Sequence, residues 1–124
     1  MAKSKPEVEF PGDTPPVELE IVDNEIGTGA EAKAGDIVSV HYVGVAHSTG
    51  EEFDSSWNRG TPLRFQLGVG MVISGWDQGV QGMKVGGRRT LRIPSSMAYG
   101  DRGVPGTIAP GEALVFVCDL EGIG

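Results

Sequence analysis

Apolar and polar residues alternate along several short segments of the chain. Val38, Val40 and Tyr42 lie on one side of such an alternation, with Ser39 and His41 between them. Successive side chains of a β-strand point to opposite faces of a sheet, so this pattern is typical of a strand with one buried face. Patterns of this kind, together with turn signals between them, predict strands over residues 17–21, 38–42, 51–57, 63–67, 88–93 and 113–120. The last segment is nearly all apolar, which indicates a central place in the sheet.

A helical pattern is found in one segment only. Trp76, Val80 and Met83 recur at intervals of four and three residues, which places them on one face of a helix over residues 74–83. Ser74 and Asp77 are spaced as in a capping box at the start of this helix.

Two glycines weaken the predicted helix. Gly79 and Gly82 each lower its intrinsic stability by up to about 1 kcal/mol relative to alanine. Packing against the sheet must therefore hold it in place. We expect an α+β fold in which an antiparallel sheet of five or six strands surrounds one short helix.

The domain organisation is simple. A chain of 124 residues has room for one compact domain. Residues 1–16 contain four of the eight prolines, with mixed charges and little apolar content, and are predicted to form a flexible, Pro-rich N-terminal tail. Residues 17–124 are predicted to form the domain.

Composition excludes several classes of protein. The net charge of −7 repels polyanions, so nucleic acid is not an expected partner, and an oligonucleotide-binding barrel would need a basic groove. No apolar run approaches the roughly 20 residues that a membrane span requires, and the N-terminus lacks the apolar region of a signal peptide. The single cysteine, Cys118, cannot form an internal disulfide. We expect a soluble cytoplasmic monomer.

Few residues offer covalent or metal chemistry. His41 and His47 have no recognisable partner for nucleophilic catalysis, and His41 is expected to be an exposed or capped surface histidine. The two histidines and Cys118 lack the spacing of a zinc site, so neither a metal nor a cofactor is expected. The segment Gly27–Ala32 matches the dinucleotide-binding pattern G-x-G-x-x-A, but no helix follows it, so a turn is predicted. Cys118 is interpreted as a small buried hydrophobe.

The segment between the last two strands is long and carries apolar residues. Residues 94–112 show no periodicity, and loops of more than about 15 residues are usually functional or disordered. Tyr99, Val104 and Ile108 favour a binding loop, because a disordered linker does not need them.

Other apolar side chains stand at positions that commonly line pockets, such as the junction of a loop and a helix. The candidates are Tyr42, Phe53, Phe65, Val72, Ile73, Trp76, Tyr99 and Phe116. Asp54 is the one acid in this aromatic setting, and it is interpreted equally well as a pocket residue or as a solvated carboxylate or turn cap without a functional role.

Seven short motifs follow one another in a characteristic order. They are VHYVG at 40–44, GEEFDSS at 50–56, FQLG at 65–68, VISGWDQG at 72–79, GM at 82–83, VG at 85–86 and AYG at 98–100. From about Leu19 to Leu120 the chain resembles the FKBP-type peptidyl-prolyl cis-trans isomerases. The resemblance implies a twisted antiparallel sheet around one helix. It also implies accelerated rotation of X-Pro bonds in proline-containing peptides and unfolded chains, and binding of macrolides such as tacrolimus or rapamycin.

The resemblance also implies roles for individual residues. Asp54, Tyr99 and Tyr42 match the polar groups near the rotating bond. Trp76 matches the floor beneath the proline ring, and the Ile73 N–H matches a donor to ligand carbonyls. The substrate-binding set is Phe53, Leu63, Phe65, Val72, Ile73, Trp76, Val104, Ile108 and Phe116. Asp54 either orients Tyr42 or interacts with the displaced carbonyl carbon, and both alternatives stay open.

Four positions depart from the best-known eukaryotic pattern of the family. Leu63 stands where phenylalanine is common, Met71 where an acid is common, Val104 where histidine is common and Thr107 where isoleucine is common. Leu63, Val104 and Thr107 are expected at the pocket rim, so they bear on substrate preference and macrolide affinity more than on activity. The alternative function is a non-catalytic module that binds proline-containing segments or acts as a chaperone.

Overall fold

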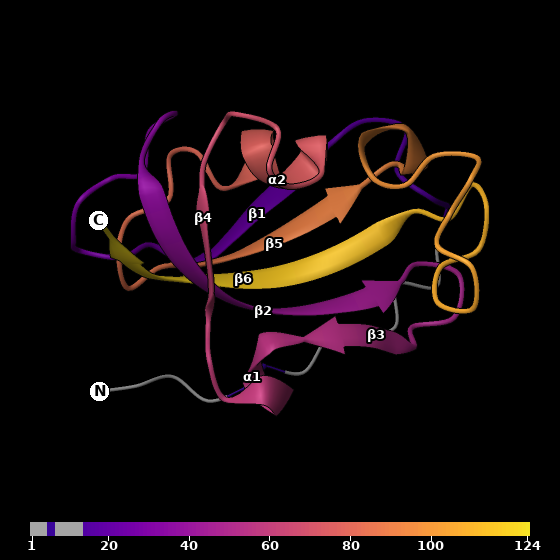
Figure 1. Cartoon of the computed structure of the whole chain (residues 1–124), viewed down its shortest axis with the longest axis horizontal. Coiled ribbons are helices and arrows are strands. Elements are labelled where there is room, and N and C mark those ends of the chain that lie inside the picture. The colour runs from indigo at the N-terminus through magenta and orange to yellow at the C-terminus, as the bar shows by residue number, and fades with distance from the viewer. Residues whose placement is uncertain (1–4, 7–13) are drawn as a thin grey trace.

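One antiparallel sheet of six strands forms the framework of the protein, which we describe for residues 5–6 and 14–124 of a computed structural model. The strands are β1 (Glu20–Glu25), β2 (Ile37–Ala46), β3 (Glu52–Ser55), β4 (Leu63–Gln66), β5 (Arg88–Ile93) and β6 (Leu114–Ile123). Their order is β1-β5-β6-β2-β3, and β4 also pairs with β2 (Figure 1). The predicted α+β fold is confirmed.

Three short helical segments accompany the sheet. They are α1 (Ser56–Arg59), α2 (Ser74–Gly79) and the 3-10 helix η1 (Ser95–Met97). Figure 1 shows α2 against one face of the sheet near β5, and α1 directly after β3. Within the described part of the chain, no helix is long and apolar enough to cross a membrane.

The central strands β2 and β6 supply most of the core. Each has ten residues, and they pair along nearly their whole length, with Tyr42 opposite Cys118 and Gly44 opposite Phe116. Seven consecutive residues of β6, 114–120, are buried, as the nearly continuous apolar run predicts. The face of the sheet toward α2 carries the main apolar cluster, which includes Val38, Leu91 and Trp76.

The first strand differs from its prediction. β1 begins at Glu20, Val17 is 90% exposed, and every residue of β1 is classed as exposed. The alternation over 17–21 predicts a half-buried strand, and this is wrong because, among the described residues, β1 is an edge strand that pairs with β5 alone. Leu19, just before the strand, packs partly against the core.

The predicted third strand over 51–57 is shorter than expected. β3 ends at Ser55, and the chain then forms the single helical turn of α1. The prediction of only one helical segment is therefore wrong. Four residues make about one helical turn, which is too short for a periodic apolar pattern to show.

The helix α2 is also shorter than the predicted 74–83. Beyond Gly79 the chain turns, and the Met83 N–H bonds the Val80 carbonyl three residues earlier. The capping box is not formed, because the residue at the N-cap is Ile73 and no side chain caps the helix. Asp77 instead accepts hydrogen bonds from the Gly68 and Gly70 N–H groups, both at 2.8 Å.

The N-terminal tail predicted over residues 1–16 lies largely outside the described residues. Of those that are described, Pro16 is buried and Lys5 contacts the corner formed by β3 and α1. The boundary of the domain at residue 17 stays a prediction.

Candidate active site

A cavity of about 380 Å³ opens between the sheet and the segment that leads into α2. This volume falls within the range of small-molecule sites. The lining residues come from β2, β3, β4, β6, the turn before α2, α2 itself and the long loop. They are Tyr42, Phe53, Asp54, Leu63, Met71, Val72, Ile73, Trp76, Tyr99 and Phe116.

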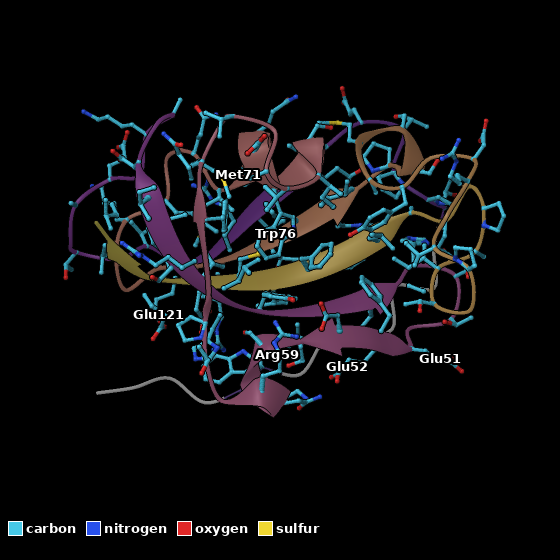
Figure 2. The ribbon with its side chains drawn as sticks, in the orientation of Figure 1. Glu51, Glu52, Arg59, Met71, Trp76 and Glu121 are labelled. Atoms are coloured by element: carbon cyan, nitrogen blue, oxygen red, sulfur yellow. The ribbon has the colours of Figure 1, made fainter. Side chains whose placement is uncertain are left out.

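Trp76 forms the floor of the cavity. The residue is only 3% exposed yet lines the cavity, and three aromatic rings surround its indole. Tyr42 and Phe116 meet the indole edge-on, with ring centroids at 4.9 Å and 5.2 Å, and Phe65 supports it at 5.7 Å. Such edge-to-face pairs are favourable for aromatic rings. Figure 2 shows Trp76 between the sheet and α2.

A glycine on β2 makes room for the aromatic wall. A Cβ atom on Gly44 would lie 2.6 Å from Cε1 of Phe116 and 2.8 Å from Cζ of Phe53. The two phenylalanine rings therefore meet edge-on across this position, at a centroid distance of 5.5 Å. A side chain at residue 44 would displace these two rings, which line the cavity.

Three polar side chains form a closed triangle at one side of the cavity. The Tyr42 hydroxyl donates to Asp54 Oδ2 at 2.5 Å, and Arg59 donates to Asp54 Oδ1 at 2.8 Å and to the Tyr42 oxygen at 2.9 Å. Asp54 therefore orients Tyr42, as the first of the two alternatives for this residue requires. The second alternative, an interaction with the displaced carbonyl carbon, stays a prediction.

Arg59 was not among the residues predicted from the sequence. It lies on α1, the helical turn that periodicity does not reveal, and its guanidinium also stands 5.6 Å from the centre of the Tyr42 ring. The signal that could have found it is chemical: an acid predicted in an aromatic pocket needs a cationic or hydrogen-bonding partner. Arg59 follows Asp54 by five residues.

The two tyrosines at the cavity are uncharged at neutral pH. Burial raises the pKa of Tyr42 above its ordinary value, and the hydrogen bond to Asp54 raises it further, while Arg59 lowers it. Burial likewise raises the pKa of Tyr99, with a smaller effect from the Asp54 charge. Both phenols therefore keep the proton that they need as hydrogen-bond donors.

Two donors at the cavity have no acceptor within the described residues. The Tyr99 side chain is 40% exposed, and its hydroxyl makes no hydrogen bond to the described part of the chain. The Ile73 N–H also has none, although its carbonyl accepts bonds from Trp76 and Asp77. Both groups are available to a ligand, and their role as donors to a bound ligand stays a prediction.

Asp77 organises the turn that carries the apolar rim. Through its bonds to Gly68 and Gly70 the carboxylate ties residues 68–70 to α2, immediately before Met71. Met71 is 62% exposed and lines the cavity beside Val72. Met71 thus places an apolar side chain at the mouth of the cavity.

Several predicted pocket residues do not line the cavity. Phe65 lies behind Trp76 and supports it. Val104 and Ile108 pair with each other in an isolated β-bridge, and the Ile108 side chain is buried in the main apolar cluster. Thr107, exposed in the same loop, is also away from the lining residues, whereas Leu63 lines the cavity as expected of a rim residue.

Both histidines have partners. His41 is half-buried, with Nδ1 2.8 Å from Ser56 Oγ and its ring stacked on Trp57 at 4.1 Å, which agrees with the prediction of an exposed or capped surface histidine. His47 is 2% exposed, with Nε2 at 3.1 Å from an Arg92 nitrogen. Neither contacts a nucleophile of the cavity. Both partners lie far away in the sequence, beyond the reach of a local motif.

Cys118 and the glycine-rich segment 27–32 have structural places in the fold. Burial raises the pKa of the Cys118 thiol well above its ordinary value, which makes it a poor nucleophile. The segment from Gly27 to Ala32 forms a turn and a bridge to residues 83–85, as predicted, and no helix follows. Among the described residues, no group of three or more acidic, histidine or cysteine side chains could hold a metal ion.

Comparison with known proteins agrees with this geometry. Residues 29–121 match the family model described as FKBP-type peptidyl-prolyl cis-trans isomerase. The chain is 69% identical to an FK506-binding protein of Streptomyces anulatus, over 99% of this chain and all of that one. It is 59% identical to the peptidyl-prolyl cis-trans isomerase FPR2 of Saccharomyces cerevisiae, over 73% of this chain and 67% of that protein.

A solved structure has the same architecture. The crystal structure of AtFKBP13 superimposes with a TM-score of 0.79 and 45% sequence identity, covering 86% of this chain and 93% of that one. The aromatic cavity, the order of the sheet and the extent of these matches lead to one conclusion. The chain belongs to the FKBP-type peptidyl-prolyl cis-trans isomerase family, whose members accelerate rotation about X-Pro peptide bonds.

Proposed function

We propose that the cavity over Trp76 is the place where this isomerase binds the proline ring of its substrate. The observation that carries the proposal is an indole floor enclosed by Tyr42, Phe116 and Phe65, open on one side to an apolar cavity. A five-membered ring fits such a site by shape and by hydrophobicity. The substrates are proline-containing peptides and unfolded chains.

The reaction needs no covalent step. Resonance in the X-Pro amide sets a rotational barrier of roughly 18–20 kcal/mol. Rotation by about 90° removes this resonance and weakens the carbonyl dipole, so the planar amide gains more from hydration than the twisted one. A cavity that strips water from the amide therefore favours the twisted form.

Positioning supplies the second contribution. The Ile73 N–H and the Tyr99 hydroxyl, both without an acceptor in the described residues, hold the backbone on either side of the proline. The proline ring stays over Trp76 while the preceding carbonyl swings. A rate gain of about 10⁵-fold requires about 7 kcal/mol of differential stabilisation.

The triangle of Asp54, Arg59 and Tyr42 has a supporting part in this mechanism. It fixes the Tyr42 ring against Trp76 and places one carboxylate at the side of the cavity. The balance of charge between Asp54 and Arg59 limits the net field in the cavity, so that the apolar character of the floor is preserved.

Exchange spectroscopy tests the catalytic proposal. Cis–trans exchange of a short X-Pro peptide, followed by NMR, should accelerate at micromolar protein. Asp54→Val and Tyr99→Phe should both lower the acceleration while the folded spectrum is retained. No acceleration by the unaltered chain would favour the alternative, a module that binds proline-containing segments without catalysis.

Macrolide binding is proposed for the same cavity. The chain has two tryptophans, and Trp57 stacks on His41 outside the cavity lining. In a Trp57→Phe variant, tacrolimus or rapamycin should therefore change the fluorescence of Trp76 alone. Saturable quenching that an X-Pro peptide reverses supports a common site, and unchanged fluorescence contradicts it. Cytoplasmic localisation and a monomeric state remain proposals, to be tested by cell fractionation and by sedimentation.

A further inference from the structure

Lys5 lies against the corner where β3 meets α1, although it is far in the sequence from the residues that line the cavity. Its ammonium is 2.9 Å from Glu52 Oε1 and 3.0 Å from Asn58 Oδ1. Asn58 in turn donates to Glu52 Oε2 at 2.9 Å. The three side chains form a closed ring that joins the N-terminal segment, β3 and α1.

Both elements held by this ring carry members of the Asp54–Arg59–Tyr42 triangle. Glu52 precedes Asp54 by two residues on β3, and Asn58 directly precedes Arg59 on α1. Figure 2 places Arg59 and Glu52 at the same corner of the molecule, with Trp76 and Met71 toward α2. The distance between the Asp54 carboxylate and the Arg59 guanidinium thus depends on how α1 sits on β3.

The helical turn α1 cannot fix its own position. It has four residues, and no side chain caps its N-terminus. A single turn of helix is unstable in isolation, so contacts with other elements must hold it. The contacts that hold it include the stack of Trp57 on His41 and the ring around Lys5.

We propose that Lys5 is a positioning residue for the isomerase reaction, which acts by holding α1 against β3 so that Arg59 stays bonded to Asp54 and Tyr42. This inference rests on the proposed function of the cavity. It makes a residue outside the predicted domain of 17–124 a contributor to the site.

The expected effect is modest and depends on salt. The Lys5 and Glu52 side chains are 39% and 34% exposed, so their attraction is partly screened by water and ions. Exposed pairs contribute up to about 1 kcal/mol, which corresponds to at most about a fivefold change in kcat/KM. Because the ion pair weakens in salt, this contribution should fade as the ionic strength rises.

The test compares three variants of the full chain with the unaltered chain, in peptide isomerisation at low and high salt. Lys5→Met should lower kcat/KM about two- to fivefold at low salt, mainly through kcat. The difference from the unaltered chain should vanish at high salt. Lys5→Arg should restore the activity, because it keeps the charge. Lys84→Met, which removes an exposed lysine that does not line the cavity, is the matched control.

Glu52→Gln provides an independent measurement on the other partner. It should reproduce the loss, and Lys5→Met with Glu52→Gln together should lose no more than either alone, because both remove one interaction. Equal kcat/KM for Lys5→Met and Lys84→Met would overturn the inference, as would additive losses. If the unaltered chain shows no catalysis, the proposed function fails instead, so the two failures are distinguishable.

Discussion

The hydroxyl of Tyr42 is bonded on one side to an acid and on the other to a cation, and the two partners act on it in opposite directions. Asp54 and burial raise the pKa of Tyr42, whereas Arg59 lowers it. The phenol proton therefore stays on Tyr42 at neutral pH, and the ring is held in one orientation against Trp76.

Replacing Arg59 should disturb both the titration and the activity. In Arg59→Met the pKa of Tyr42 should rise further, because the group that lowers it is gone. The variant loses two charge-assisted hydrogen bonds at a partly exposed site. This loss should raise the activation free energy by about 1–2 kcal/mol, which lowers kcat/KM about 5- to 30-fold. Spectrophotometric titration in a Tyr99→Phe background isolates Tyr42, since the chain has two tyrosines.

Arg59→Lys serves as the control, since it keeps the charge but not the forked geometry. Its activity should lie between those of the unaltered chain and of Arg59→Met. An Arg59→Met protein with unchanged Tyr42 titration would contradict the triangle of hydrogen bonds.

The raised pKa of Tyr42 also makes a prediction about stability at high pH. Its pKa is higher in the folded chain than in the unfolded chain, where it is about 10. The neutral phenol is thus favoured by folding, and this contribution is complete below about pH 10 and is lost as the pH rises through the folded value. Denaturant unfolding should show a fall in stability above pH 10 that is smaller in Tyr42→Phe. The pKa of Tyr99 is also raised, so Tyr99→Phe should remove a further, separate part of the fall in stability.

Among the elements, α2 shows why a sequence pattern can find a helix but not its environment. The recurrence of Trp76 and Val80 predicts a helix correctly, and both side chains are buried. Gly79 is read from sequence alone as a weak point of this helix. The structure shows why glycine stands at residue 79, since a Cβ atom there would lie 2.7 Å from Leu91 Cδ2 on β5.

Gly79→Ala is therefore expected to destabilise the protein although alanine is the better helix former. The gain in helix propensity is at most about 1 kcal/mol. Forcing a methyl group against Leu91 costs about 1–3 kcal/mol in a packed core. Thermal or denaturant unfolding should show a net loss, and Leu91→Val in the same chain should recover part of it. A more stable Gly79→Ala protein would show that α2 can move away from the sheet.

Elements without a periodic apolar pattern could not be predicted from the sequence. The single turn of α1 and the bridge between Val104 and Ile108 are each too short for periodicity to reveal. The exposure of β1 could not be foreseen either, because alternation reports a half-buried strand and not its position at the edge of a sheet. The long paired strands β2 and β6, by contrast, follow directly from their apolar runs.

For the whole molecule, the aromatic part of the candidate site could be predicted and the polar part only in pieces. Tyr42, Phe53, Trp76 and Phe116 were expected together and line one cavity. Aromatic side chains can be recognised in the sequence as pocket candidates by their size and hydrophobicity. Arg59, by contrast, becomes significant only through the contacts that the fold creates. The same is true of the buried charge in the sheet.

Asp119 is that buried charge, and it offers a test of how the sheet is held together. It lies on β6 with its side chain 1% exposed, and Arg88 on β5 donates to its two oxygens at 2.6 Å and 2.8 Å. This forked bond joins the two strands on the face of the sheet opposite to that of Cys118. Asp119→Ala leaves the half-buried Arg88 guanidinium without this partner, so unfolding stability should fall by about 3 kcal/mol.

Asp23→Ala is the matched comparison, because Asp23 bonds Arg89 at 2.6 Å from a side chain that is 40% exposed. Its loss should lower stability by less than about 1 kcal/mol, since Asp23 itself is exposed and Arg89 keeps its bonds to the Gly79 and Gln81 carbonyls. Chemical denaturation of both variants measures the contrast. Equal losses would mean that burial does not set the strength of these two bonds, and that β5 is secured to the sheet mainly by its backbone hydrogen bonds and by Leu91.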